Sequence, residues 1–108
     1  MANAFKNGYL DITNSAQTIY TAPASTESVV LSLRVTNVNG SASDYVTCDV
    51  IDSSSGNSRI AYQLTIPADT SVDLIENKIV LETGDLIKLT GGQASGYLEA
   101  LISVLEIT

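Results

Sequence analysis

The chain of 108 residues has no histidine, no tryptophan and a single cysteine. Histidine is the usual general base beside a catalytic nucleophile, so its absence argues against hydrolytic triads. One cysteine can form no internal disulfide and cannot supply the cluster of Cys and His that holds zinc. This residue, Cys48, lies between Val46 and Val50 in an alternating segment. That setting predicts a buried side chain and not a reactive thiol.

Positive charge is also scarce, with five Lys and Arg against twelve Asp and Glu and a formal net charge of −7. Nucleic-acid binding requires a cluster of basic residues that neutralises phosphates. The basic residues of this chain are scattered singly, at Lys6, Arg34, Arg59, Lys78 and Lys88. We therefore expect no nucleic-acid partner, and the acidic balance also argues against docking on an anionic membrane.

Long apolar runs are missing as well. A membrane-spanning helix needs about 20 consecutive apolar residues, and no run in this sequence approaches that length. The first residues, MANAFKNGYLDITNS, contain no apolar stretch like the core of a signal peptide. We expect a protein without a membrane segment or signal peptide that is made in a cytoplasm.

What the chain does contain is an ordinary share of apolar residues, 44%, with charged residues at only 16%, against a usual value of about 25%. Ser, Thr and Asn supply much of the remaining polarity, and these residues suit strands and turns. The length supports one domain with one core. A surface with few charges fits either a thinly charged β protein or a protein whose surface is covered by other subunits.

The dominant pattern is an alternation of apolar and polar residues with a period of two, which is typical of half-buried strands. In the segment 29–37, one face is predicted to carry Val29, Leu31, Leu33 and Val35. Strands are predicted at residues 4–12, 18–21, 29–37, 45–52, 59–66, 72–75, 86–90 and 97–107. The predicted fold is all-β, a single antiparallel β-sandwich or jelly roll of about eight strands. Residues 15–108 would form the sandwich, and residues 1–14 an N-terminal arm or first strand.

Turn-forming residues separate the predicted strands. Asn39 and Gly40 both tolerate positive φ, which predicts a hairpin between the strands 29–37 and 45–52. Gly84 followed by an aspartate predicts a second tight hairpin. The segment 91–96 contains three glycines but neither a lysine nor a following helix. It therefore predicts a flexible hairpin loop and not a phosphate-binding loop.

Acidic residues raise two further alternatives, because paired carboxylates serve glycosidases and carboxylate oxygens bind calcium. The carboxylate pairs are Asp49 with Asp52 and Glu82 with Asp85, and the calcium candidates are Asp44, Asp49, Asp52 and Asn57. No EF-hand pattern occurs, and acids in turns usually accept hydrogen bonds from backbone amides. We therefore predict no catalytic, cofactor-binding or metal-binding residues and no enzyme activity.

Two features indicate self-association. Tyrosine is enriched at protein interfaces, although ordinary core and rim packing is the favoured explanation; the five tyrosines are Tyr9, Tyr20, Tyr45, Tyr62 and Tyr97. The last predicted strand, 97–107, is apolar on both faces. Such a strand is either central between two packed layers or exposed to a partner subunit.

The order of several segments resembles a known group of proteins. The segments are TIYTAPA at 18–24, TNVNG at 36–40, IPA at 66–68, IVLETGD at 79–85 and ISVLEI at 102–107. In this order they resemble small β-sandwich proteins encoded among the virion genes of tailed phages, many of them marine or cyanobacterial. The resemblance extends over residues 18–107.

This resemblance implies a structural component of the virion. The first candidate is a capsid decoration or cement protein that stabilises the head by bridging subunits. The alternative is a tail, neck or fibre accessory module that acts in assembly or binds host-surface carbohydrate. The implied partners are the major capsid protein and copies of the same chain, with a trimer as one candidate stoichiometry. The resemblance supplies no catalytic residues, and the N-terminal segment 1–14 lies outside it.

Overall fold

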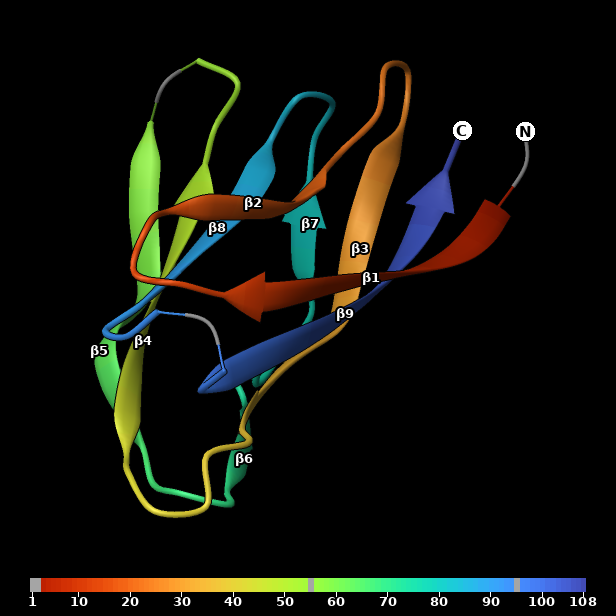
Figure 1. Cartoon of the computed structure of the whole chain (residues 1–108). Helices are drawn as coiled ribbons and strands as arrows, with labels where there is room; N and C mark the ends of the chain where they lie inside the picture. Colours follow the sequence, from red (N-terminus) through yellow and green to blue (C-terminus); the bar gives the residue numbers. More distant parts are fainter. Residues whose placement is uncertain (1–2, 55, 95) are drawn as a thin grey trace.

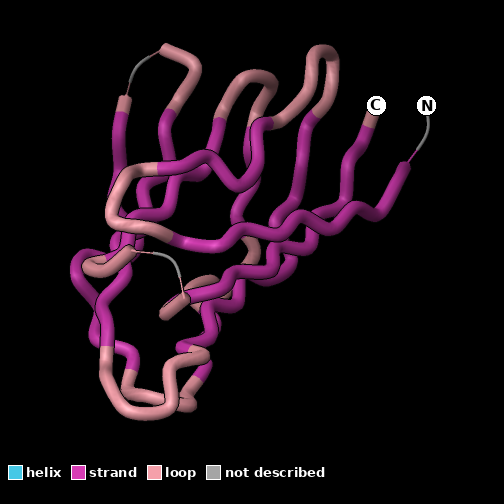
Figure 2. The backbone as a smooth tube through the Cα atoms, viewed as in Figure 1, coloured by secondary structure: helices cyan, strands magenta, loops and turns pink. Residues whose placement is uncertain are grey.

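The computed structural model describes residues 3–54, 56–94 and 96–108. Within these ranges the chain forms strands, turns and bends (Figure 2), and no helix long and apolar enough to cross a membrane occurs there. The described strands are β1 (Asn3–Ile12), β2 (Gln17–Thr21), β3 (Glu27–Asn37), β4 (Asp44–Ile51), β5 (Asn57–Ile66), β6 (Ser71–Asp73), β7 (Ile79–Leu81), β8 (Leu86–Gly91) and β9 (Leu98–Ile107).

The strands form two antiparallel sheets (Figure 1). Sheet A has the order β1-β9-β3-β6, with β7 also paired to β3, and sheet B has the order β2-β8-β4-β5. β6 pairs with residues 34–36 of β3 and β7 pairs with residues 28–30, so the two occupy one edge like a single interrupted strand. With β6 and β7 taken together, this strand order is that of a jelly roll. The predicted fold class is confirmed.

The hairpins predicted at Asn39 and at Gly84 are wrong, because the turns carry the chain from one sheet to the other. Residues 38–43 connect β3 in sheet A to β4 in sheet B, and residues 82–85 connect β7 in sheet A to β8 in sheet B. In the first of these loops, Asn39 Oδ1 accepts hydrogen bonds from the backbone N–H groups of Ser41 and Ala42, each at 2.9 Å. The Asn-Gly sequence indicates a local turn but does not determine which strand the chain pairs with next.

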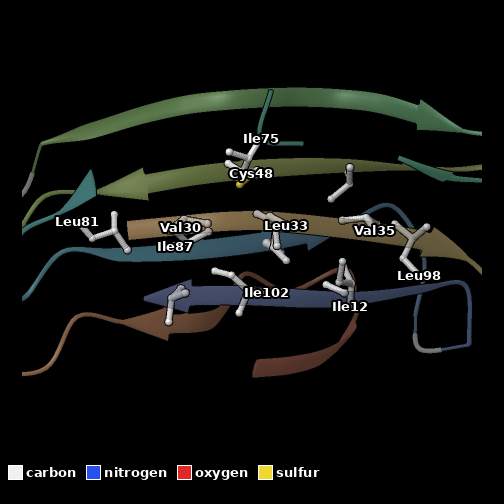
Figure 3. Close-up of a cluster of buried hydrophobic side chains, with 14 of the residues drawn as sticks. Ile12, Val30, Leu33, Val35, Cys48, Ile75, Leu81, Ile87, Leu98 and Ile102 are labelled. Carbon is white, nitrogen blue, oxygen red and sulfur yellow. The ribbon is translucent and has the colours of Figure 1, made fainter. Parts of the chain in front are cut away.

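The inner faces of the two sheets enclose one apolar core (Figure 3). A register shift just after Val30 is a β-bulge, and it leaves both Val30 and Leu33 fully buried. The prediction that one face carries Val29, Leu31, Leu33 and Val35 is therefore wrong for the first two, which lie on the outer side. The largest fully buried side chains are Ile12, Leu33, Ile66, Leu81, Ile87, Leu89, Leu98 and Ile102.

Loops gather at the two ends of the sandwich (Figure 2). At one end the β2–β3, β4–β5 and β7–β8 connections are joined by hydrogen bonds. Thr83 Oγ1 donates to Thr26 O at 2.8 Å, and Asp85 Oδ1 accepts from Ser53 N at 3.0 Å. Gly84 has a φ of 87°, and a Cβ there would lie 2.9 Å from Ser53 Cβ. This turn therefore requires glycine.

At the other end, the glycine-rich segment after β8 leads from sheet B to sheet A and is not the predicted hairpin. Residue 95 of this segment lies outside the described residues. On either side of it, Gly92 N donates to Asp44 Oδ1 at 3.0 Å, and Tyr97 O accepts from Val38 N at 2.7 Å. These bonds tie the segment to both ends of the β3–β4 connection.

Candidate assembly surface on sheet A

β9 lies in the centre of sheet A, between β1 and β3. Its inner face is buried in the core through Leu98, Ala100, Ile102 and Val104. Its outer face is turned away from the core and carries Leu101, which is 38% exposed, together with the partly buried Leu105 and Ile107. The core thus accounts for one apolar face of this strand, and the other faces outward.

An apolar row crosses the outer face of sheet A. The register places four residues from four strands opposite one another: Phe5 of β1, Leu105 of β9, Val29 of β3 and Val80 of β7. Opposed residues of antiparallel strands project on the same side of the sheet. At the two ends of the row, Phe5 is 77% exposed and Val80 is 61% exposed. Contiguous exposed apolar surface on a small domain marks a contact site.

A second row crosses the same face from Tyr9. The register places Tyr9 opposite Leu101 of β9, and Leu101 opposite Arg34 of β3. The Tyr9 side chain is 76% exposed. Between the two rows, Ser103 Oγ donates a hydrogen bond to Asn7 Oδ1 at 2.8 Å. The outer face of sheet A therefore carries the apolar row, a polar pair, and a row in which Tyr9 and Leu101 are followed by the charged Arg34.

Two shallow depressions flank Tyr9, with volumes of about 280 Å³ and 230 Å³. Their lining combines an aromatic ring with two carboxylates and one guanidinium, from Tyr9, Leu10, Asp11, Arg34, Thr36, Glu99, Ala100 and Leu101. Pockets for small molecules usually measure about 300–1,000 Å³. These depressions lie below that range.

Sheet B carries charged side chains together with the exposed Tyr45, Tyr62 and Leu64. Lys88 of β8, Asp49 of β4 and Arg59 of β5 lie opposite one another. The Nε atom of Arg59 lies 3.2 Å from Asp49 Oδ1, and its guanidinium lies 4.7 Å from the centre of the Tyr62 ring. The register does not place the exposed side chains of sheet B in one row, as it places Phe5 to Val80 on sheet A, so we place the candidate assembly surface on sheet A.

A cluster of polar side chains lies near the chain termini, between the ends of β1, β2, β3 and β9. The Tyr20 hydroxyl donates to Glu106 Oε2 at 2.5 Å and lies 2.7 Å from Ser28 Oγ. Lys6 Nζ lies 3.7 Å from Glu106 Oε1. Burial, and then the hydrogen bond to Glu106, raise the pKa of Tyr20 to about 12. The cluster gives the nearly buried Glu106 carboxylate a hydrogen-bond donor and an ion-pair partner, and it thereby stabilises the fold.

Cys48 lies on the inner face of β4 and is fully buried. Burial raises the pKa of its thiol to about 12, with a smaller contribution from Asp49. At neutral pH the thiolate is therefore scarce, and Cys48 packs as a small apolar residue. The prediction that this side chain is buried is confirmed.

The carboxylates named above as candidates for catalysis or calcium binding make other interactions in the structure, namely hydrogen bonds from backbone N–H groups and an ion pair. Asp52 Oδ1 accepts from Ser54 N at 3.1 Å, and Asp85 Oδ2 accepts from Glu82 N at 2.9 Å. Asp49 pairs with an arginine, and Asn57 begins β5 with an exposed side chain. In residues 3–54, 56–94 and 96–108, no group of three Cys, Asp or Glu side chains is placed to hold a metal ion.

The five tyrosines divide between the two predicted roles. Tyr9 lies on the outer face of sheet A, Tyr45 and Tyr62 are exposed on sheet B, Tyr97 packs against the core and Tyr20 belongs to the polar cluster.

Sequence reasoning missed Val80 as the end of the apolar row and Glu106 as a buried carboxylate. For Glu106 a signal was present, since it occupies the same alternation as the buried residues of β9.

No protein-family model matches the chain, and no curated protein matches its sequence. Solved structures share its fold. A protein of the acidic stable capsid structure of Helicobacter pylori bacteriophage KHP30 aligns over 100% of this chain and 89% of its own, with a TM-score of 0.59 and 10% identity. A protein of the Bacillus endospore appendages, a family of disulfide-linked pili, aligns over 99% and 87%, with a TM-score of 0.57 and 12% identity. These structural neighbours are thus capsid and pilus proteins, and at such identities the likeness establishes the shared all-β fold.

Proposed function

We propose that the chain is a non-enzymatic structural component of a phage particle, and specifically a capsid decoration or cement protein that stabilises the head by bridging subunits. The observation that carries this proposal is the apolar row from Phe5 to Val80 on the outer face of sheet A. The resemblance of the motif order to tailed-phage virion proteins supports the same setting. So does the fold shared with a protein of a phage capsid.

A protein that holds neighbouring subunits together gains free energy from apolar surface removed from water. Fully burying a side chain such as Phe or Val contributes about 1.5–3 kcal/mol, and part of this gain is offset by the entropy lost on association. Phe5 and Val80 lie at opposite ends of the row and retain most of their exposure in the free chain. Covering the whole row therefore provides a contact that spans sheet A, repeated at every equivalent position of a symmetric particle.

The partners proposed are the major capsid protein and copies of this chain, and the location proposed is the virion, after synthesis in the host cytoplasm. Residues 3–12 of the N-terminal segment lie in β1, where most of their side chains are exposed. This segment, predicted as a unit from residue 1 to residue 14, would thus contribute to the contact through the free side of β1 and the Phe5 and Tyr9 side chains.

Copy number in purified particles tests this proposal. Particles that carry the gene for this chain are purified, and the chain is quantified by mass spectrometry against the major capsid protein. We expect a fixed ratio corresponding to many copies per head. A handful of copies per particle would favour the tail, neck or fibre alternative, and absence from the particle would contradict a virion role.

A second candidate function rests on the depressions beside Tyr9. Protein sites for sugars combine aromatic rings with hydrogen-bonding groups, and Tyr9 is flanked by Asp11, Glu99 and Arg34. Host-surface carbohydrate binding by a tail or fibre module is therefore the alternative. The test is glycan-array binding of the isolated protein, in which binding that Tyr9→Ala abolishes would favour this alternative over head decoration.

A further inference from the structure

We propose that β1 is a pairing edge for a second copy of this chain, and that two copies join β1 to β1 in antiparallel orientation about a two-fold axis at Asn7. The partner is thus a second copy of the same chain, held by main-chain hydrogen bonds and by two aromatic pairs. The inference concerns the chain itself and holds whether or not the chain belongs to a virion.

β1 differs from the other edges of the two sheets. It pairs with β9 through ten consecutive residues without a register shift. β2 has five residues and a register shift, β6 and β7 have three residues each, and β5 has two register shifts and a residue, Gln63, with a φ of 47°. Bulges, short strands and inward-pointing charges are devices by which proteins prevent an edge from pairing. The one inner-face charge near the middle of β1, Lys6, is paired with Glu106 of its own chain. β1 is long and regular, so its free side offers a continuous series of N–H and C=O groups.

The side chains of β1 are arranged symmetrically about Asn7. Phe5 and Tyr9 lie two positions to either side of it, both on the outer face of sheet A. Their exposed fractions, 77% and 76%, are nearly equal. A strand that pairs with its own copy needs this kind of arrangement, because each position must suit the position that the two-fold axis places opposite.

With the axis at Asn7, every opposed pair is compatible. Phe5 lies opposite Tyr9 of the second copy, and the symmetry repeats this pair, so two cross-strand aromatic pairs form on one face. On the inner face Lys6 lies opposite Gly8 of the second copy, which has no side chain. Ile102 Cγ2 and Ile19 O of that copy lie 3.0 Å and 3.4 Å from where a Cβ of Gly8 would stand, so the Lys6 side chain must extend past them toward solvent. Asn3 lies opposite Asp11 of the second copy, an amide beside a carboxylate.

Other axis positions give poorer pairs. An axis at Lys6 places the two Lys6 side chains opposite each other, and directly opposed like charges are destabilising. An axis at Gly8 places Phe5 opposite Asp11 of the second copy and loses both aromatic pairs. The register centred on Asn7 also brings the Phe5 row of one copy into line with the Tyr9 row of the other, which extends the apolar surface of sheet A across both copies.

Cysteine cross-linking tests the register directly. Opposed Cα atoms of antiparallel strands lie about 4.5–5.5 Å apart, within the range for a disulfide. Asn3→Cys and Asp11→Cys chains, mixed under mild oxidation, should therefore form a mixed disulfide. Neither variant should cross-link with itself, because its two cysteines would lie eight positions apart along the strand, or about 27 Å. The native Cys48 is fully buried and does not interfere.

Sedimentation analysis of the full chain tests the pairing itself. We expect a concentration-dependent dimer, and we expect Phe5→Ser and Tyr9→Ser together to weaken it about 10- to 100-fold, since aromatic pairs of this kind contribute on that scale. The matched control is Tyr62→Ser on the bulged edge β5, which should leave the dimer unchanged. Circular dichroism of each variant shows that the sandwich remains folded.

Three results would overturn the proposal. The first is a wild-type chain that stays monomeric at every concentration and gives no mixed disulfide. The second is a dimer in which Asn3→Cys cross-links with itself, because the register would then be wrong. The third is a dimer that Tyr62→Ser weakens and the β1 double variant does not, because the pairing edge would then be β5.

Discussion

The hydroxyl of Tyr20 and the carboxylate of Glu106, 86 positions apart in the chain, are joined by a hydrogen bond of 2.5 Å at a nearly buried site. Ser28 and Lys6 complete the surroundings of these two groups. The cluster connects β2 of sheet B to β9 of sheet A, so it holds the two sheets together where the chain begins and ends.

Replacing Tyr20 by Phe should therefore destabilise the fold. The change leaves a nearly buried acceptor on Glu106 without its hydroxyl donor, and such losses amount to about 1–3 kcal/mol. Urea unfolding of Tyr20→Phe against wild type measures the free energy of unfolding. Tyr62→Phe, at an exposed ring, is the control and should stay within about 0.5 kcal/mol. Equal stability of all three proteins would show that the bond contributes nothing.

The stability of the fold should decrease at alkaline pH. The pKa of Cys48 is raised from 9.0 to about 12 and that of Tyr20 from 10.0 to about 12, because burial favours the protonated forms. Their contributions are complete below pH 9 and pH 10 respectively, and they are lost as the pH rises toward 12. Thermal melting at a series of pH values measures the decline, and Cys48→Val should shift its onset from about pH 9 toward pH 10. An unchanged onset would contradict the assignment to Cys48.

Two glycines with positive φ should respond differently to alanine. Gly84 and Gly96 have φ values of 87° and 99°, but a Cβ at Gly84 would meet Ser53 Cβ at 2.9 Å and one at Gly96 would meet nothing within 4 Å. Each substitution should lose about 1–2 kcal/mol from the backbone conformation, and Gly84→Ala should lose more because of the contact. Chemical denaturation measures both. Adding Ser53→Gly should recover the excess at position 84, and no recovery would count against the contact.

Substitutions in the apolar row and in the core should have different effects on the free energy of unfolding. Val80 is 61% exposed, so Val80→Asp should change the free energy of unfolding by no more than about 0.5 kcal/mol. Ile102 is fully buried, so Ile102→Ala should lose about 2–5 kcal/mol. Urea titrations of both variants check this, and a large loss at Val80 would mean that the residue stabilises the fold and not an assembly contact.

The fold class could be predicted from the sequence, because the alternation of apolar and polar residues in segments such as 45–52 corresponds directly to the inner and outer faces of the strands. It was insufficient where distant pairing decides the outcome. The turns at Asn39 and Gly84 indicate a change of direction, yet both lead to the opposite sheet. The bulge after Val30 reverses the alternation of inner and outer side chains in β3, and no residue type in this segment predicts a bulge. The outer row joins Phe5 to Val80 through two intervening strands, which only the register between strands reveals.

We propose that the outer face of sheet A attaches this chain to a virus particle, and rebinding to particles that lack the chain is the direct test. Purified wild-type protein is added to such particles, and bound protein is quantified against the major capsid protein. We predict saturable binding at a fixed ratio, strongly weakened by Val80→Asp and unchanged by Leu64→Asp, a matched change at a side chain of β5 that is 42% exposed. Val80 lies on β7, at the edge opposite β1, so this variant leaves pairing through β1 intact. Failure of the wild-type protein to bind, or equal binding by all three proteins, would contradict the claim.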